Sequence, residues 1–142
     1  MADFFDFLIR HWILSTLFVV LFIALVMNEF KRRLLGFKGL SPQEVVALIN
    51  RGDAVVVDLR DETEFRQGHI INAKNIPMGL LEARLVELDP ARDKTIILCC
   101  KTGQVSARAA ARLVKEGFAR VCKLNGGLPA WQSAELPLER SS

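Results

Sequence analysis

The chain has 142 residues, a hydrophobic share of 51% and a formal net charge of +3. This length indicates one folded domain, and the composition excludes an intrinsically disordered protein. Residues 1–40 carry five basic and three acidic side chains, a net charge of +2, so residues 41–142 carry only +1. The small charge of the second part argues against nucleic acid as the main partner, because a nucleic-acid-binding domain carries a basic stripe.

The three cysteines are Cys99, Cys100 and Cys122. An odd number without a repeated spacing does not predict a disulfide framework, and a bond between two adjacent cysteines would be strained. The chain has no CxxC pair and only two histidines, which argues against a zinc site. We therefore expect free thiols in a reducing compartment, with no metal and no cofactor.

Residues 1–30 are predicted to form a transmembrane anchor. Residues 11–28 contain no charged side chain, and between Trp12 and Met27 only Ser15 and Thr16 are polar. Such a run reaches the length needed to cross a hydrocarbon core of about 30 Å. The alternative is a core helix, but a core helix normally has a polar face and this segment has none. We therefore expect this segment to lie in a lipid bilayer.

The flanks of this segment predict an uncleaved, single-pass topology. Asp3 and Asp6 stand where a signal peptide has basic residues, and no small-x-small cleavage site follows. Only Arg10 precedes the apolar run, whereas residues 31–33 are all basic. The positive-inside rule then places the N-terminus outside and the C-terminal domain in the cytoplasm, with the anchor in the inner (cytoplasmic) membrane.

Residues 31–40 are predicted to be a basic juxtamembrane linker, and residues 41–142 the folded domain. Ser41 is suited to be the N-cap of a helix in which Pro42 takes the first position and Glu44 completes a capping box. Gly52 can end this helix.

The remainder of the chain alternates between strand and helix patterns. Strands are expected at 54–59, 73–76, 95–99 and 120–124, and helices from Asp61, at 80–88, at 107–116 and around Trp131. This alternation predicts an α/β fold in which helices flank a parallel sheet. Ligands of such sheets bind beyond the carboxyl ends of the strands, where Cys100 and residues 58–60 lie.

The stretch from Cys100 to Ser106 joins a strand to a helix through a short loop. Backbone N–H groups and the helix dipole at such a junction stabilise an anion and lower the pKa of a thiol, so Cys100 is a candidate nucleophile. A buried structural cysteine is the alternative. The candidate binding residues form the rest of the loop: Lys101, Thr102, Gly103, Gln104, Val105 and Ser106.

Five stretches follow one another along the chain: residues 55–60, 64–70 and 73–77, the Cys100 loop, and Gly126-Gly127 before Trp131. In this order they resemble the rhodanese-like (sulfurtransferase) domain, and with the anchor they resemble its membrane-bound bacterial members. The resemblance implies a parallel sheet of about five strands flanked by helices. It also implies that a Cys100 thiolate takes a sulfane sulfur from a donor such as thiosulfate or a persulfide and passes it to a thiol acceptor.

One position departs from the family pattern. Many active members carry arginine at the last loop position, where this chain has Val105. An arginine would bind an anionic donor, so we expect poor use of thiosulfate. Related phosphatases and arsenate reductases have a longer loop, whose arginine would fall at Ser106. Phosphatase activity therefore lacks the guanidinium that a phosphate dianion needs.

Two readings remain open for the remaining candidates and for the whole domain. Asp58 and Arg60 either form the rim of the site or tie a strand end to a helix, and His69 is expected to fasten a loop. Cys99 and Cys122 are expected in the core, although Cys122 could be a resolving thiol.

The domain is either a sulfurtransferase or a weakly active binding module that the anchor places beside another membrane protein.

Overall fold

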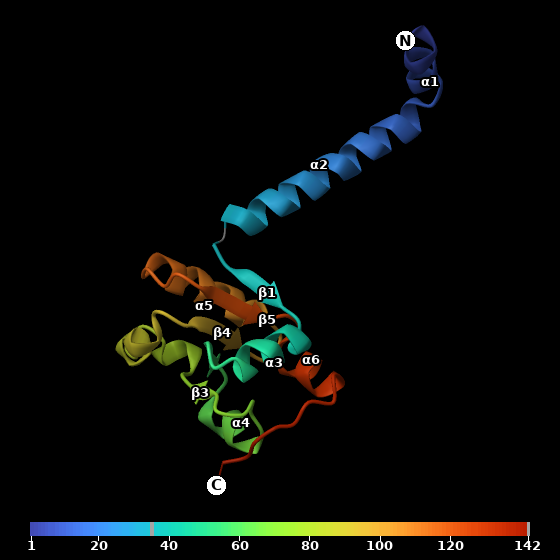
Figure 1. The fold of residues 1–142 in the computed structure, drawn as a ribbon. Coiled ribbons are helices and arrows are strands. Elements are labelled where there is room, and N and C mark those ends of the chain that lie inside the picture. Colours follow the sequence, from blue (N-terminus) through green and yellow to red (C-terminus); the bar gives the residue numbers. More distant parts are fainter. Residues whose placement is uncertain (35, 142) are drawn as a thin grey trace. The chain divides into compact units, whose positions relative to one another are not determined.

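The computed structural model describes residues 1–34 and 36–141, with the side chains of residues 32–34 excluded. It divides into two compact units, Met1–Leu35 and Gly36–Ser142. These units are considered separately below, and Figure 1 shows the ribbon of each.

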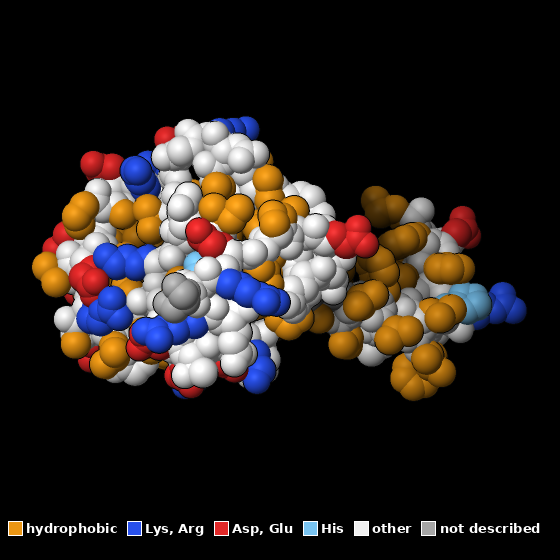
Figure 2. Space-filling view, turned by 90° about the horizontal axis from the view of Figure 1, so that it is seen from below, with side chains coloured by type: hydrophobic (Ala, Val, Ile, Leu, Met, Phe, Trp, Pro, Cys, Tyr) orange, Lys and Arg blue, Asp and Glu red, His pale blue; other side chains and the backbone are white. Residues whose placement is uncertain are grey.

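The N-terminal unit consists of α1 (Ala2–Arg10) and α2 (Trp12–Leu34). The segment Trp12–Lys31 is long and apolar enough to cross a membrane, and none of it is buried within the protein. Apolar side chains gather on these helices in Figure 2. The Thr16 hydroxyl donates a hydrogen bond to the Trp12 carbonyl at 2.7 Å, so one of the few polar groups in the segment is satisfied within the helix.

The two helices are interrupted at His11, whose φ of −115° and ψ of 39° are not helical. The aromatic residues before Trp12 therefore belong to a separate short helix and do not extend α2. Uncharged composition alone could not reveal this break, because it depends on the backbone of one residue.

A five-stranded parallel sheet forms the centre of the second unit, in the order β1-β5-β4-β2-β3 (Figure 1). The strands are β1 (Lys38–Leu40), β2 (Ala54–Asp58), β3 (Lys74–Asn75), β4 (Thr95–Cys99) and β5 (Val121–Leu124). The parallel α/β architecture predicted from the sequence is confirmed. Asp58 pairs with Cys99 across β2 and β4, so the next residues of both strands leave the same edge of the sheet.

The first strand lies within residues 31–40, which the sequence analysis assigns to a linker. Lys38 pairs with Cys122 and Leu40 with Leu124, so the sheet begins three residues before the expected domain boundary. β1 is short and contains Gly39, which weakens any strand pattern. A Cβ at Gly39 would lie 2.2 Å from the Asn125 side chain, which shows how closely this edge is packed.

Helices cover both faces of the sheet and enclose two apolar clusters. On one face Ile96 and Leu98 of β4 pack with Ala109 and Leu113 of α5 (Gln104–Lys115). On the other face lie Ile97 and Cys99, together with residues from two further helices, α3 (Pro42–Asn50) and α6 (Gly127–Ser133). β4 is buried throughout because its alternate side chains enter both clusters.

Two local predictions differ from the structure, whereas the α4 helix (Glu62–Gln67) begins after Asp61 as expected. Residues 80–88 do not form one helix. Two 3₁₀ segments, Met78–Leu80 and Leu85–Ala91, occupy this region, and Pro90 lies within the second. The helix expected from residue 107 begins at Gln104, because Gly103 adopts a left-handed conformation (φ 87°) at its N-cap.

The capping box at the start of α3 is confirmed. Ser41 Oγ accepts the N–H of Glu44 at 3.3 Å, and Glu44 Oε2 accepts the N–H of Ser41 at 2.8 Å. Two backbone donors that the helix cannot satisfy are therefore paired.

Replacing Ser41 by alanine should lower the free energy of unfolding by about 1 kcal/mol, because one N-cap acceptor is lost. The measurement is urea unfolding of the full chain in detergent, followed by Trp131 fluorescence in a Trp12→Phe background. Ser133→Ala at the exposed C-terminal end of α6 is the matched control. Equal stabilities for the two variants would contradict a stabilising role for the box.

Candidate active site

Cys100 is the first residue after β4, and its side chain is almost completely buried, with 2% of its surface exposed. The loop that follows curls back so that the N–H of Gly103 donates a hydrogen bond to Cys100 Sγ at 2.9 Å. The left-handed φ of Gly103 makes this tight return possible at the start of α5. The sulfur therefore lies at the N-terminus of a twelve-residue helix.

The pKa of the Cys100 thiol is lowered by this environment. Burial is the largest influence and acts to raise the pKa, but the Ser106 hydroxyl and the N–H groups of Ser106, Thr102 and Gly103 together outweigh it. Ser106 Oγ is fully buried and forms no regular hydrogen bond to any group in the described chain. The nearby hydroxyl lowers the pKa of Cys100 and so favours the thiolate form.

The other two thiols have a different environment. Burial, with a smaller contribution from Asp58, raises the pKa of Cys99, and burial also raises the pKa of Cys122. Both side chains pack with the cluster of α3 and α6, whereas Cys100 belongs to the cluster of α5. The sheet thus separates Cys100 from both, which argues against Cys122 as a resolving thiol for it.

Cys100 contributes to the wall of a pocket of about 220 Å³. Three apolar side chains, those of Leu59, Met78 and Val105, form part of its lining, and four charged residues form another part: Arg60, Asp61, Glu64 and Lys101. The ammonium group of Lys101 lies 3.6 Å from Glu64 Oε1. A thiolate with access to a small mixed pocket is an arrangement suited to nucleophilic attack on a small or slender substrate.

Asp58 and Arg60 form a buried ion pair at the neighbouring strand end. Arg60 Nη2 lies 2.8 Å from Asp58 Oδ2 and also donates to the Gly68 carbonyl at 2.7 Å. Asp58 has 1% of its surface exposed and Arg60 lines the pocket, so the pair joins β2 to the end of α4 and also borders the site. Burial acts to lower the pKa of Arg60, but the bonds with Asp58 raise it overall.

Two residues that support the site were not identified from the sequence in this role. Asn75 Nδ2 donates to the carbonyls of Asp58 and Arg60 at 3.1 and 2.9 Å and so holds the chain between them. Gly127 lies against the Cys100 loop, where a Cβ would come within 2.4 Å of the Cys100 carbonyl oxygen. The sequence shows this glycine only as part of the Gly126-Gly127 pair before Trp131, because its close approach to Cys100 depends on the tertiary fold.

His69 lies outside this pocket and fastens the C-terminal tail. Its Nδ1 is 2.7 Å from the Phe65 carbonyl, and its ring stacks on that of Phe65 at 3.8 Å. The backbone of His69 exchanges hydrogen bonds with that of Glu139 at 2.8 and 2.7 Å. These contacts give His69 a structural role, since they attach the C-terminal tail to the end of α4, and this role is the kind that the sequence predicts.

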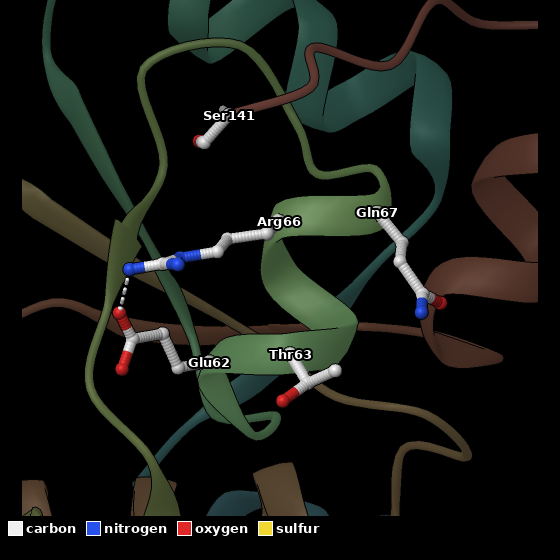
Figure 3. Close-up of a pocket in the computed structure, with 5 residues that line it drawn as sticks. All are labelled: Glu62, Thr63, Arg66, Gln67 and Ser141. Carbon is white, nitrogen blue, oxygen red and sulfur yellow. Dashed lines mark hydrogen bonds and ion pairs between the residues drawn. The ribbon is translucent and has the colours of Figure 1, made fainter.

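A second hollow, of about 400 Å³, lies over α4 (Figure 3). It is lined by Glu62, Thr63, Arg66, Gln67 and Ser141, and Figure 3 shows the Arg66 guanidinium turned toward Glu62, with which it pairs at 2.5 Å. Its lining includes no thiol. Among the described residues no group of three or more potential ligands is placed to hold a metal ion. The Cys100 pocket is therefore the candidate site.

Comparisons with known proteins identify the family of the chain. The family model of the rhodanese-like domain matches residues 41–134. The chain is 37% identical over 141 residues to YibN of Escherichia coli (strain K12), a protein described as uncharacterized, and the match covers 99% of both chains.

Two further comparisons involve the domain alone. The thiosulfate sulfurtransferase GlpE of Stutzerimonas stutzeri is 36% identical over 96 residues, which cover 68% of this chain and 85% of that protein. The crystal structure of a rhodanese-like domain protein from Staphylococcus aureus superposes with a TM-score of 0.65 at 26% identity, over 74% of this chain and 99% of the other.

The Ser106→Ala substitution should raise the pKa of Cys100, because it removes a donor that favours the thiolate. The measurement is the pH dependence of iodoacetamide labelling at Cys100, read by peptide mass spectrometry on the full chain. The labelling midpoint should move to higher pH in Ser106→Ala and stay in place in Ser133→Ala. A midpoint that does not respond to Ser106→Ala would show that the hydroxyl does not act on the sulfur.

Proposed function

Because the chain belongs to the rhodanese-like family, we propose that it is a membrane-anchored sulfurtransferase that carries sulfur as a Cys100 persulfide. One observation above all supports this function: Cys100 Sγ accepts the Gly103 N–H at 2.9 Å in a loop that lowers the thiol pKa, next to a pocket. The match to GlpE, which is named a thiosulfate sulfurtransferase, supports the same class of reaction.

The proposed reaction has two displacements. The Cys100 thiolate attacks the outer sulfur of a donor such as thiosulfate, the donor S–S bond breaks, and sulfite leaves with the bonding electron pair. The new Cys100–S–S⁻ group carries one negative charge, and a thiolate acceptor then attacks its terminal sulfur and regenerates the Cys100 thiolate. No redox cofactor is required, since each step exchanges one sulfur nucleophile for another.

The loop can stabilise the anion at each stage. The N–H groups of Thr102, Gly103 and Ser106 are directed toward Sγ, and a terminal sulfur added to Sγ remains near the same positive end of α5. Gln104 and Lys101 belong to the loop as well, but the Lys101 side chain is largely exposed and paired with Glu64. Backbone donors therefore provide most of the stabilisation in this proposal.

Membrane attachment forms part of the proposal. The α2 segment has the length and composition of a span, and the match to YibN covers 99% of both chains, so it includes the N-terminal helices. The basic residues at 31–33 favour a cytoplasmic C-terminal domain, with residues 1–30 as the anchor in the inner membrane. A single-pass chain with its N-terminus outside follows from this assignment.

A binding module is the second candidate. Val105 occupies the position where an arginine would hold an anionic donor, and it contributes an apolar wall to the pocket. Weak turnover with thiosulfate would suit a domain that the anchor positions beside another membrane protein. The two candidates differ in whether Cys100 accepts sulfur at all.

Incubation of the purified full chain with thiosulfate or an organic persulfide should add the mass of one sulfur atom. Cyanide should remove this sulfur as thiocyanate, and Cys100→Ser should remain unmodified, whereas Cys122→Ser should still accept the sulfur. Intact-mass spectrometry provides the measurement. If none of these donors yields an adduct, the binding module replaces the enzyme.

The topology should be visible by labelling engineered cysteines in intact cells. An impermeant maleimide should modify Asp3→Cys, which lies before the span, and should modify Gln132→Cys, at an exposed position of α6, only after the cells are permeabilised. The unsubstituted chain measures the background from native thiols. Labelling of Gln132→Cys in intact cells would overturn the cytoplasmic assignment.

A further inference from the structure

The Cys100 pocket contains two cationic side chains, and each of them is paired with a carboxylate. Arg60 is held by Asp58 at 2.8 Å and by the Gly68 carbonyl at 2.7 Å, and only 9% of its side chain is exposed. Lys101 is paired with Glu64 at 3.6 Å. A dianionic donor would have to compete with these carboxylates for both cations.

The charges of the pocket also cancel. Two basic residues line it, and their charges are offset by the carboxylates of two acidic residues, Asp61 and Glu64. The backbone donors of the loop are already directed to Cys100 Sγ and can support the single charge of a thiolate or persulfide. Apart from Arg60 and Lys101, which are both paired with carboxylates, this lining contains no cationic side chain for a second charge on the incoming donor.

The uncharged part of the pocket is apolar. Leu59 belongs to the buried cluster beneath the site, and Met78 and Val105 pack against that cluster while they line the pocket. Contact between such a surface and hydrocarbon is favourable, whereas the surface offers neither a charge nor a hydrogen bond to the SO₃ group of thiosulfate.

From these contacts we infer that Glu64 determines the charge selectivity of the Cys100 pocket. By neutralising Lys101 at the pocket mouth, it directs the site toward organic persulfides, R–S–SH or R–S–S⁻, and away from dianionic donors such as thiosulfate. This inference rests on the proposed sulfur transfer. Glu64 acts as a positioning residue, because its effect on the reacting sulfur passes through Lys101.

The chemistry with such a donor balances. The Cys100 thiolate attacks the outer sulfur of R–S–SH, a new S–S bond forms, and the donor S–S bond breaks. R–S⁻ leaves with the electron pair and takes up the proton released from the transferred sulfur, so Cys100–S–S⁻ and R–SH remain. The apolar wall at Met78 and Val105 contacts R during the attack.

Charge selectivity can be measured without turnover. Iodoacetate and iodoacetamide alkylate the same thiolate and differ in one negative charge, so the ratio of their rate constants at Cys100 reports how the pocket treats an anion. In the full chain Glu64→Gln should raise the iodoacetate-to-iodoacetamide ratio by roughly two- to fivefold, the range expected when an exposed ion pair is opened. Val105→Arg should raise the ratio as well, since it adds a third cation to a lining that otherwise holds two basic and two acidic residues.

Glu62→Gln is the matched control, because Glu62 lies on the same helix but pairs with Arg66 outside the Cys100 pocket. Its ratio should equal that of the unsubstituted chain. In a Lys101→Met background the Glu64→Gln effect should be smaller, because no ammonium group remains to be released. An equal effect in both backgrounds, or an unchanged ratio in Glu64→Gln, would overturn the role assigned to this pair.

The donor preference is tested on the same variants. The unsubstituted chain should form the Cys100 persulfide faster from an organic persulfide than from thiosulfate at equal concentration, and Glu64→Gln should narrow the difference. A faster reaction with thiosulfate would overturn the inferred selectivity while sulfur transfer itself stands. Failure of every donor to modify Cys100 would instead overturn the proposed function, whatever the alkylation ratios.

Discussion

The contact between the backbone of Cys100 and the start of α6 is the constraint on which the site depends. The Cys100 carbonyl accepts the N–H of Leu128 at 2.9 Å, and Gly127 lies so close to this carbonyl that a Cβ there would overlap it. The left-handed conformation of Gly103 then turns the loop back, so that its N–H reaches Cys100 Sγ at 2.9 Å. The N–H groups of the loop thereby converge on Sγ. A buried thiol that would otherwise have a raised pKa becomes one with a lowered pKa.

The electrostatic design of the site follows from the same geometry. Backbone donors and the α5 N-terminus favour one negative charge at one position, the Cys100 sulfur. The side chains around them are already paired: Arg60 with Asp58, and Lys101 with Glu64. Val105 adds hydrocarbon where a guanidinium would add charge. In the proposed reaction the pocket holds a thiolate and then a persulfide of the same charge, and a donor with two further charges competes with carboxylates for its cations.

The sequence predicted the features that depend on local pattern. Ser41 and Glu44 form the expected capping box, β4 is the expected buried strand, and Cys100 opens the expected strand-to-helix loop. What it missed depends on contacts between distant segments. β1 exists because Lys38 pairs with Cys122, Asn75 bonds to the carbonyls of Asp58 and Arg60, and Gly127 is required by Cys100. The start of α5 was misplaced for a related reason, since Gly103 was assigned to the binding loop and not to the N-cap of the helix.

The placement of the three thiols bears on how sulfur would leave the site. Cys99 is adjacent to Cys100 in sequence, but alternation along the strand puts the two in clusters on opposite faces of the sheet. Cys122 packs with the cluster of Cys99, and burial raises the pKa of both. A persulfide at Cys100 thus has no thiolate of its own domain in a position to attack it. In the proposed reaction the sulfur must therefore be transferred to an external thiol. This acceptor would enter the pocket past Glu64 and Lys101, as the donor does, so the same ion pair would act on the selection of both.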